Sequence, residues 1–144
     1  MSAGSRRSGR AYALQLLYAR DGDQASDVYG DTASWAQEFD LDVDSQAQQF
    51  AREIVEAAST RAAEIDQLIT TSSKNWRLDR MSRVDRNILR LGTCELLTFR
   101  DVPLKVVINE AVELAKRFGT AESSAFVNGV LDRIATAVGR SPED

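Results

Sequence analysis

The side chains best suited to binding a ligand are three arginines close to the N-terminus. Arg6, Arg7 and Arg10 precede an apolar stripe that includes Leu14. A helix, at 100° per residue, would bring Arg7 and Arg10 in line with Leu14 and continue the stripe as a basic face beyond the core. Guanidinium groups there could pair with phosphate oxygens. Gly9 lowers the helix propensity of this stretch, which favours ordering on binding. A solvated N-terminal tail is the alternative interpretation.

A second basic series surrounds Trp76. It consists of Lys74, Arg77, Arg80, Arg83, Arg86 and Arg90. Arginine can pair with phosphate or stack on a base, and an aromatic ring offers single-stranded bases a platform. Asp79 and Asp85 interrupt the series, however, and opposite charges at three- to four-residue steps are typical of an ordinary exposed helix face. The helix-face interpretation is preferred for this series.

Several other chemistries are excluded by residues that the sequence lacks. It contains no histidine, which removes the commonest metal ligand and every Ser-His or Cys-His pair. The single cysteine, Cys94, cannot form an internal disulfide and lies among apolar residues, which predicts a buried, inert thiol. No glycine-rich nucleotide-binding motif is present. We therefore expect no metal site, no cofactor and no enzymatic activity.

Helical periodicity accounts for almost the whole chain, and no strand is needed. Neither glycine nor proline occurs between residues 31 and 91. The first helix is expected over residues 8–20. An acid-rich connection follows, with a short helix around residues 34–39. Asp44 is then the expected N-cap of a long amphipathic stretch that breaks near residues 59–60.

Three more helices are expected in the second half of the chain. Ser82 and Asp85 are spaced as in a capping box, and Pro103 opens the following helix. Gly119 is expected to end that helix in the left-handed conformation, and Thr120 to cap the last helix. On periodicity alone, Tyr18 and Phe126 are core residues.

Length and charge distribution limit the class of protein. The 144 residues fit one domain. The net charge of −4 divides unevenly, into +4 over residues 1–20, −10 over 21–72 and +2 over 73–144. Because salt screens charges over about 8 to 10 Å, a local basic patch can act by itself. No apolar run approaches the roughly 20 residues of a membrane helix, and no export signal is evident, so we expect a cytoplasmic protein without a membrane partner.

Taken together, these segments resemble the family of the transcription antitermination factor NusB. The stretch from Arg6 to Tyr18 is similar to the arginine-rich motif and first helix of that family. The more specific matches lie in the C-terminal half: NWxLxR from Asn75, VDRxILR from Val84, ELL from Glu95, VPxKVVINEAVELAKxFG from Val102, and FVNGVLD from Phe126. Residues 21–72 agree only in helical pattern.

The resemblance implies an all-α fold of about seven helices, in which two packed lobes, near residues 1–72 and 73–144, form one NusB-like domain. It also implies a non-enzymatic role. With NusE, a small-subunit ribosomal protein, such proteins bind the single-stranded boxA element of nascent ribosomal RNA leaders. The complex joins other Nus factors on RNA polymerase and suppresses premature termination. Family members occur as monomers and as homodimers, so a homodimer is among the expected states.

Carried over to this sequence, the resemblance makes Arg6, Arg7 and Arg10 RNA contacts and brings Tyr18 and Phe126 near the RNA path. Asp85 matches an acidic position that faces NusE. The arginine cluster is less dense here than is usual in the family, so we expect weak RNA binding by the chain alone and a shallow salt dependence. Affinity is expected to appear in the heterodimer with NusE.

Two other interpretations belong to different classes of protein. A similar helical domain precedes the catalytic domain of certain ribosomal RNA cytosine methyltransferases. Since these 144 residues include no methyl-donor-binding domain, at most the RNA-binding role of that domain would be shared. The other alternative is a helical scaffold that binds protein only, with the arginines as a solvated tail.

Overall fold

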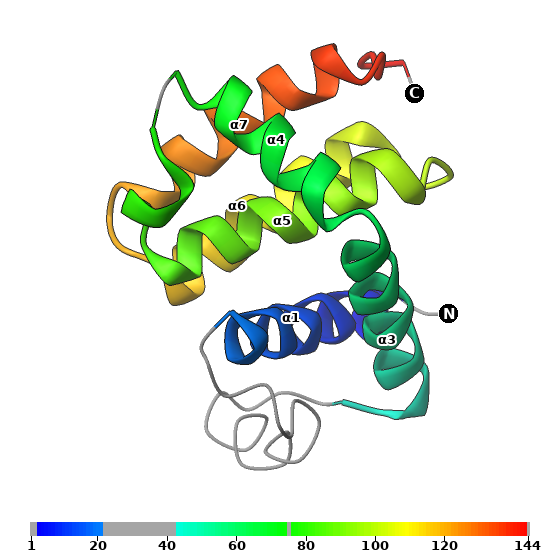
Figure 1. Cartoon of the computed structure of the whole chain (residues 1–144). Helices are drawn as coiled ribbons and strands as arrows, with labels where there is room; N and C mark the ends of the chain where they lie inside the picture. Colours follow the sequence, from blue (N-terminus) through cyan, green and yellow to red (C-terminus); the bar gives the residue numbers. More distant parts are fainter. Residues whose placement is uncertain (1–2, 22–42, 75, 144) are drawn as a thin grey trace. The chain divides into compact units, whose positions relative to one another are not determined.

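The computed structural model describes residues 3–21, 43–74 and 76–143, and all of the regular elements in these ranges are helical (Figure 1). The expected all-α fold is confirmed. Six α-helices and one short 3₁₀-helix are described, and the helix expected around residues 34–39 lies outside the described residues. None of the described helices is long and apolar enough to cross a membrane.

The chain forms two compact units, residues 1–56 and 57–144, whose boundary lies within helix α3 (Ser45–Thr60). The family resemblance had implied a boundary near residue 72. The difference arises from α4 (Ala62–Ser72), which packs against α5 (Arg83–Thr98) and α7 (Ser123–Ala137) and so belongs with the C-terminal helices. Periodicity identifies the apolar stripe of α4 but cannot tell against which neighbour it packs.

In the first unit, α1 (Ala3–Arg20) contacts α3 at Gly9. A Cβ atom on Gly9 would lie 2.9 Å from the carbonyl oxygen of Ala47 and 2.9 Å from Cδ2 of Phe50. Glycine therefore lets the two helices approach more closely than any other residue would. The helix begins five residues earlier than the sequence indicated, and Gly9 lies in helix in the free chain.

The predicted cap and break of the long amphipathic stretch are both confirmed. Oδ1 of Asp44 accepts a hydrogen bond of 2.8 Å from the backbone N–H of Ala47 in the first turn of α3. This bond satisfies one of the N–H groups that have no partner within the helix. The helix ends at Thr60, and α4 starts at Ala62.

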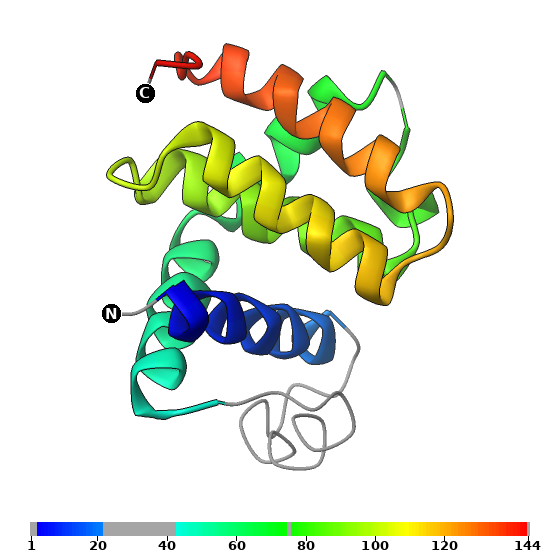
Figure 2. The ribbon, with the colours of Figure 1, turned by 180° about the vertical axis from the view of Figure 1, so that it is seen from behind.

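In the second unit, α5, α6 (Leu104–Phe118) and α7 pack against one another, as Figures 1 and 2 show. The hydroxyl of Ser82 accepts the backbone N–H of Asp85 at 3.0 Å, which confirms the predicted cap of α5. The core of this unit includes Ile65, Ile69, Ile88, Leu89, Leu91, Leu96, Val107, Val130, Leu131 and Ile134.

The buried side chain of Arg140 ties the C-terminal segment to the connection between α5 and α6. Its Nη1 donates to the carbonyl oxygen of Leu96 at 3.2 Å, and its Nη2 donates to that of Val102 at 2.7 Å. Arg140 is only 5% exposed. These bonds satisfy carbonyl groups at the end of α5 and just before α6, where a backbone carbonyl has no hydrogen-bond partner within a helix.

The prediction for Gly119 is wrong. Its backbone has φ −99° and ψ −161°, an extended conformation and not the left-handed one. A Cβ atom here would collide with the side chain of Ser123 and lie 2.8 Å from the carbonyl oxygen of Ala115. The hydroxyl of Ser123 accepts the N–H of Thr120 at 2.9 Å, and α7 begins at Ser123. Glycine is needed at this position for the close approach of Ser123.

Cys94 is completely buried within α5, as the sequence indicated. Burial, which penalises the thiolate, raises the pKa of this thiol to about 12. The thiol therefore stays protonated and unreactive at neutral pH.

We predict that Gly9→Ala lowers the free energy of unfolding by about 1 to 3 kcal/mol, because the added methyl group must separate α1 from α3. Helix propensity alone would raise it by about 1 kcal/mol. Urea denaturation followed by circular dichroism measures the change. Gly129→Ala is the matched control, since its Cβ atom would meet nothing nearer than Nη1 of Arg133 at 3.7 Å. Equal stabilisation by the two substitutions would contradict the close contact at Gly9.

Candidate nucleic-acid interface

Helix α1 carries all three N-terminal arginines, because it begins at Ala3. The side chains of Arg6 and Arg7 are exposed. No acidic residue lies in the first turn of this helix, so the positive end of the helix dipole adds to the charge of the two guanidinium groups. The first turns of α1 thus form an exposed cationic surface.

Arg10 occupies a different environment from Arg6 and Arg7. It is 3% exposed, and its guanidinium carbon lies 5.4 Å from the centre of the Phe50 ring. The sequence placed Arg10 on a face beyond the edge of the core, and this is wrong for the free chain, because α3 extends the core back to Gly9 and Phe50. The cation–π contact instead helps to hold α1 against α3.

A hydrogen bond fixes the start of α1 to the start of α3. The hydroxyl of Ser5, which is 5% exposed, donates to Oδ2 of Asp44 at 2.9 Å. The N–H of Ala47 and this hydroxyl hold the pKa of Asp44 below its ordinary value of 3.8. The carboxylate therefore caps α3 and at the same time orders the turn that carries Arg6 and Arg7.

Tyr18 and Phe126 were expected in the core on periodicity alone. Tyr18 is 37% exposed near the C-terminal end of α1, so that expectation is wrong for Tyr18. Phe126 lies in the first turns of α7 and is half-buried. Each ring thus has a surface that solvent can reach, in its own unit of the chain.

Asp85 lies in the first turn of α5 and is half-buried. Its backbone N–H bonds to Ser82, whereas its Oδ1 is buried and has no hydrogen-bond partner among the described residues. A buried carboxylate oxygen without a donor costs free energy.

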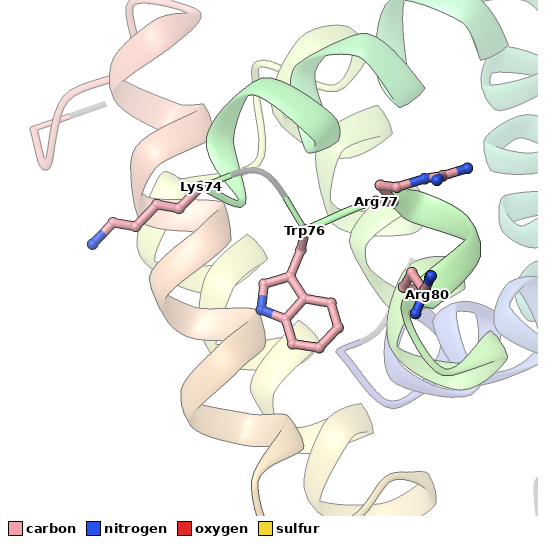
Figure 3. A pocket seen from close by; sticks show the side chains of 4 residues that line it. All are labelled: Lys74, Trp76, Arg77 and Arg80. Carbon is pink, nitrogen blue, oxygen red and sulfur yellow. The ribbon is translucent and has the colours of Figure 1, made fainter.

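Five of the six cations of the second basic series form two groups with different roles. Lys74, Arg77 and Arg80 surround Trp76, and these four side chains line an open hollow of about 320 Å³ (Figure 3). The indole is 55% exposed. This first group combines an aromatic face with three cations at the surface of the 57–144 unit.

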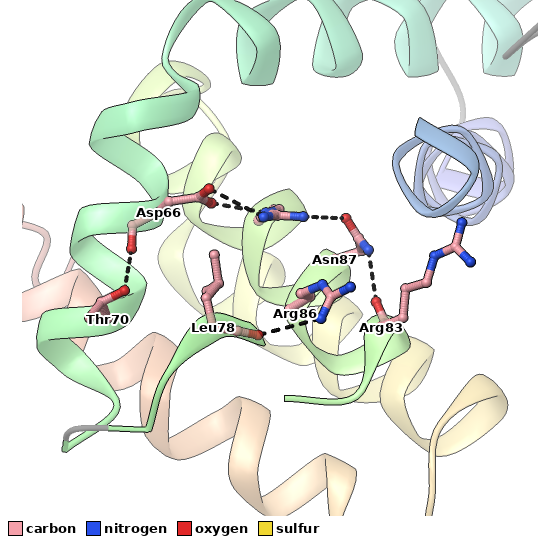
Figure 4. Close-up of polar contacts among 7 residues, drawn as sticks. Asp66, Thr70, Leu78, Arg83, Arg86 and Asn87 are labelled. Atoms are coloured by element: carbon pink, nitrogen blue, oxygen red, sulfur yellow. Dashed lines mark hydrogen bonds and ion pairs between the residues drawn. The ribbon is translucent and has the colours of Figure 1, made fainter. Parts of the chain in front are cut away.

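Arg86 and Arg90 form the second group and bond to their own unit. Figure 4 shows the bond from Arg86 to the carbonyl oxygen of Leu78. Arg90 donates to both carboxylate oxygens of Asp66, at 2.9 and 3.2 Å, and to Asn87 at 3.2 Å. Arg86 donates to the carbonyl oxygen of Met81 at 3.3 Å. Arg90 therefore pairs with Asp66 of α4, 24 residues away in the sequence, and not with an acid of its own helix, so the ordinary helix-face interpretation fits neither Arg90 nor the residues around Trp76.

The chemistry that these surfaces offer is the binding of an anion that also carries flat rings. Guanidinium groups pair with phosphate, and exposed aromatic rings stack on bases. Within the described ranges, no group of three or more His, Cys, Asp or Glu side chains could hold a metal ion.

A model of the NusB family matches residues 7–136. The chain belongs to the NusB family. It is 54% identical to the transcription antitermination protein NusB of Myxococcus xanthus over 138 residues, which cover 95% of this chain and 99% of that protein. NusB of Sorangium cellulosum is 45% identical over 141 residues, covering 98% and 99% of the two chains.

Solved structures of NusB proteins share the fold. The structure of T. maritima NusB superposes with a TM-score of 0.77 at 38% identity, covering 96% of this chain and 94% of that one. A crystal structure of the antitermination factors NusB and NusE in complex with dsRNA superposes with a TM-score of 0.78 at 28% identity, covering 94% and 99%.

Sequence reasoning missed the partners that position the NusB arginine motif. The contact between the Phe50 ring and Arg10 was not predicted. Asp44 was identified as a helix cap, but its bond to Ser5 was not foreseen. The available signal was Gly9, because a glycine within a helix often marks a close approach by another element.

We predict that Asp44→Ala destabilises the 1–56 unit near neutral pH, and that the difference from the natural chain shrinks in acid. A carboxylate whose pKa is lowered by folding stabilises the native state above its ordinary pKa of 3.8. That contribution is lost as pH falls through the lower, folded value. Thermal unfolding at several pH values measures the effect. Asp44→Asn is the control, since its amide cannot titrate in this range. A difference that does not change with pH would contradict the assignment.

Proposed function

We propose that this chain acts in transcription antitermination by binding single-stranded boxA RNA of nascent ribosomal RNA leaders together with NusE. In this proposal the heterodimer joins other Nus factors on RNA polymerase and suppresses premature termination, and the chain is a binding protein and not an enzyme. The names of its relatives and the NusB–NusE–dsRNA crystal structure support the proposal.

The observation that carries the proposal is the exposed pair Arg6 and Arg7 on an ordered helix. The Ser5–Asp44 bond and the contact at Gly9 hold this helix in the free chain. RNA binding then does not have to order the helix, which removes one entropic cost of association. Phosphate contacts of this kind set affinity and position, while sequence preference must come from contacts to bases.

Tyr18 and Phe126 are proposed to supply base contacts. Their partly exposed rings can stack on bases of a single strand, and stacking contributes about 1 to 3 kcal/mol per base. Arg10 is proposed as a third phosphate contact. Because its guanidinium group stacks on Phe50 in the free chain, RNA must draw it away from that ring.

Asp85 is proposed to face NusE. Support comes from its half-buried side chain in the first turn of α5, part of which solvent reaches. A donor from NusE would bond to the accessible part of this carboxylate, and a charge-assisted bond of this kind is stronger than a neutral one. A homodimer is proposed as a storage state that NusE or RNA would displace.

We predict that Arg6→Ala combined with Arg7→Ala weakens boxA binding by the NusE complex and reduces the dependence of log Kobs on log[salt] by roughly 1.4, at about 0.7 per lost phosphate contact. Fluorescence anisotropy with labelled boxA RNA and a scrambled RNA, with and without NusE at two salt concentrations, measures both quantities. Circular dichroism checks that the double variant remains folded.

Arg10→Ala is the comparison variant, and it should lower the melting temperature as well, because it removes the contact with Phe50. RNA affinity that survives the double substitution would favour a protein-binding scaffold with the arginines as a solvated tail. Equal, weak binding of boxA and scrambled RNA with NusE present would reject the boxA assignment.

We predict that Asp85→Lys weakens NusE binding by roughly tenfold or more. The substitution replaces a hydrogen-bond acceptor in the interface with a cation, which repels a positively charged donor of NusE. Isothermal titration calorimetry with purified NusE measures the dissociation constant. Asp101→Lys makes the same charge change at an exposed position of the same unit and should have little effect. Unchanged affinity of the Asp85→Lys variant would remove Asp85 from the interface.

A further inference from the structure

The indole of Trp76 is a large aromatic surface left open to solvent. Its exposed fraction of 55% is the largest among the bulky apolar side chains described as exposed, ahead of Val106 and Tyr18. Tryptophan is enriched at interfaces, because it combines a large apolar ring with a polar N–H group. The binding roles proposed for Arg6, Arg7 and Asp85 do not involve this side chain.

The backbone around Trp76 is held by its own unit, so the ring does not sit on a loose loop. The hydroxyl of the buried Ser73 donates to the carbonyl oxygen of Trp76 at 3.1 Å. In return, the backbone N–H of Trp76 donates to the carbonyl oxygen of Ser73 at 3.2 Å. Nε of Arg133 donates to the carbonyl oxygen of Ser72. Lys74 has a φ of +53°, a left-handed conformation that a lysine adopts only when its surroundings impose it.

The other side of the hollow is also fixed. The short helix η2 (Leu78–Arg80) is closed by a 2.9 Å bond from the N–H of Arg80 to the carbonyl of Arg77. Met81, just after this turn, is buried, and Arg86 donates to its carbonyl oxygen at 3.3 Å. The base of the hollow is therefore formed before any ligand arrives, which lowers the entropic cost of binding.

Cations dominate the charge around the indole. Lys74, Arg77 and Arg80 are all exposed, and Asp79 is the one acid in the segment 74–80. Arg77 pairs with Asp79 at 3.2 Å, but with 71% and 67% of the two side chains exposed this surface pair is weak and can exchange for a phosphate. Figure 3 shows Lys74 and Arg80 on different sides of the indole.

We propose that Trp76, Lys74, Arg77 and Arg80 form a second binding surface for single-stranded RNA, in which a base stacks on the indole and the neighbouring phosphates pair with the cations. A single strand fits better than a duplex, because the faces of paired bases are covered by their neighbours. An acidic protein segment would pair with the cations but would leave the indole face without a stacking partner. The inference rests on RNA binding as the proposed function but uses residues separate from Arg6 and Arg7.

The test uses the full chain with Trp35→Phe, so that Trp76 is the only tryptophan. Arg6→Ala and Arg7→Ala are added to remove the first RNA surface. Single-stranded oligoribonucleotides of about eight residues should quench Trp76 fluorescence in a saturable, salt-sensitive way. Inorganic polyphosphate, which has charge but no bases, and duplex RNA are the comparison ligands. Quenching by polyphosphate equal to that by single-stranded RNA would overturn the proposal.

A second measurement follows the fluorescence anisotropy of labelled RNA and gives its affinity for further variants. These variants are made in the chain that retains Trp35. Trp76→Ala should lower affinity by roughly tenfold, and Trp76→Phe should retain part of it, because phenylalanine still stacks. Arg80→Gln should reduce the dependence of log Kobs on log[salt] by about 0.7. Arg100→Gln, at another exposed position of the same unit, should not. Unchanged affinity of Trp76→Ala would overturn the proposal.

These experiments can reject the assignment of either RNA surface without rejecting the other. If boxA binding with NusE is absent but Trp76 is quenched by single-stranded RNA, the proposed function fails and the second surface stands. If boxA binding with NusE depends on Arg6 and Arg7 but Trp76 is not quenched, the second surface is rejected and the proposed function stands.

Discussion

The close contact between α1 and α3 at Gly9 is the constraint on which the N-terminal unit depends. It requires a residue without a side chain on one helix, and it brings Ala47 and Phe50 of the other helix against the backbone of the first. That approach puts the Phe50 ring within reach of Arg10 and puts Asp44 within reach of Ser5. The exposed arginines consequently project from a helix whose position is fixed by packing, a cation–π contact and a hydrogen bond.

Arginine serves two purposes in this chain, and the number of arginines alone overstates its binding surface. In the 57–144 unit, Arg86, Arg133 and Arg140 donate to backbone carbonyls, and Arg90 pairs with Asp66. A guanidinium group suits this role because its several donors can satisfy carbonyls where helices end. Three of the exposed cations, Lys74, Arg77 and Arg80, surround Trp76. Arg86 and Arg133 support this segment through their bonds to the carbonyl oxygens of Met81 and Ser72.

Features set by near neighbours in the chain could be predicted from the sequence. The caps at Asp44 and Ser82, the break near residue 60 and the burial of Cys94 all follow from spacing and local residue type. Features set by distant segments could not. The environment of Arg10 depends on a phenylalanine forty residues away. The conformation of Gly119 depends on how α7 packs against the end of α6. The boundary between the two units depends on which helices α4 contacts. Of the candidate site, the arginine motif and Trp76 were visible as residue types, but which cations are exposed was not.

The absence of histidine and the burial of Cys94 determine how binding responds to the solution. Histidine is the side chain that ordinarily changes its charge between pH 5 and 8, and the thiol, with a pKa of about 12, does not ionise in that range. The charge that the chain presents to a polyanion is therefore nearly constant across the neutral range. Ionic strength, more than acidity or oxidation, is the cellular variable to which such a surface responds.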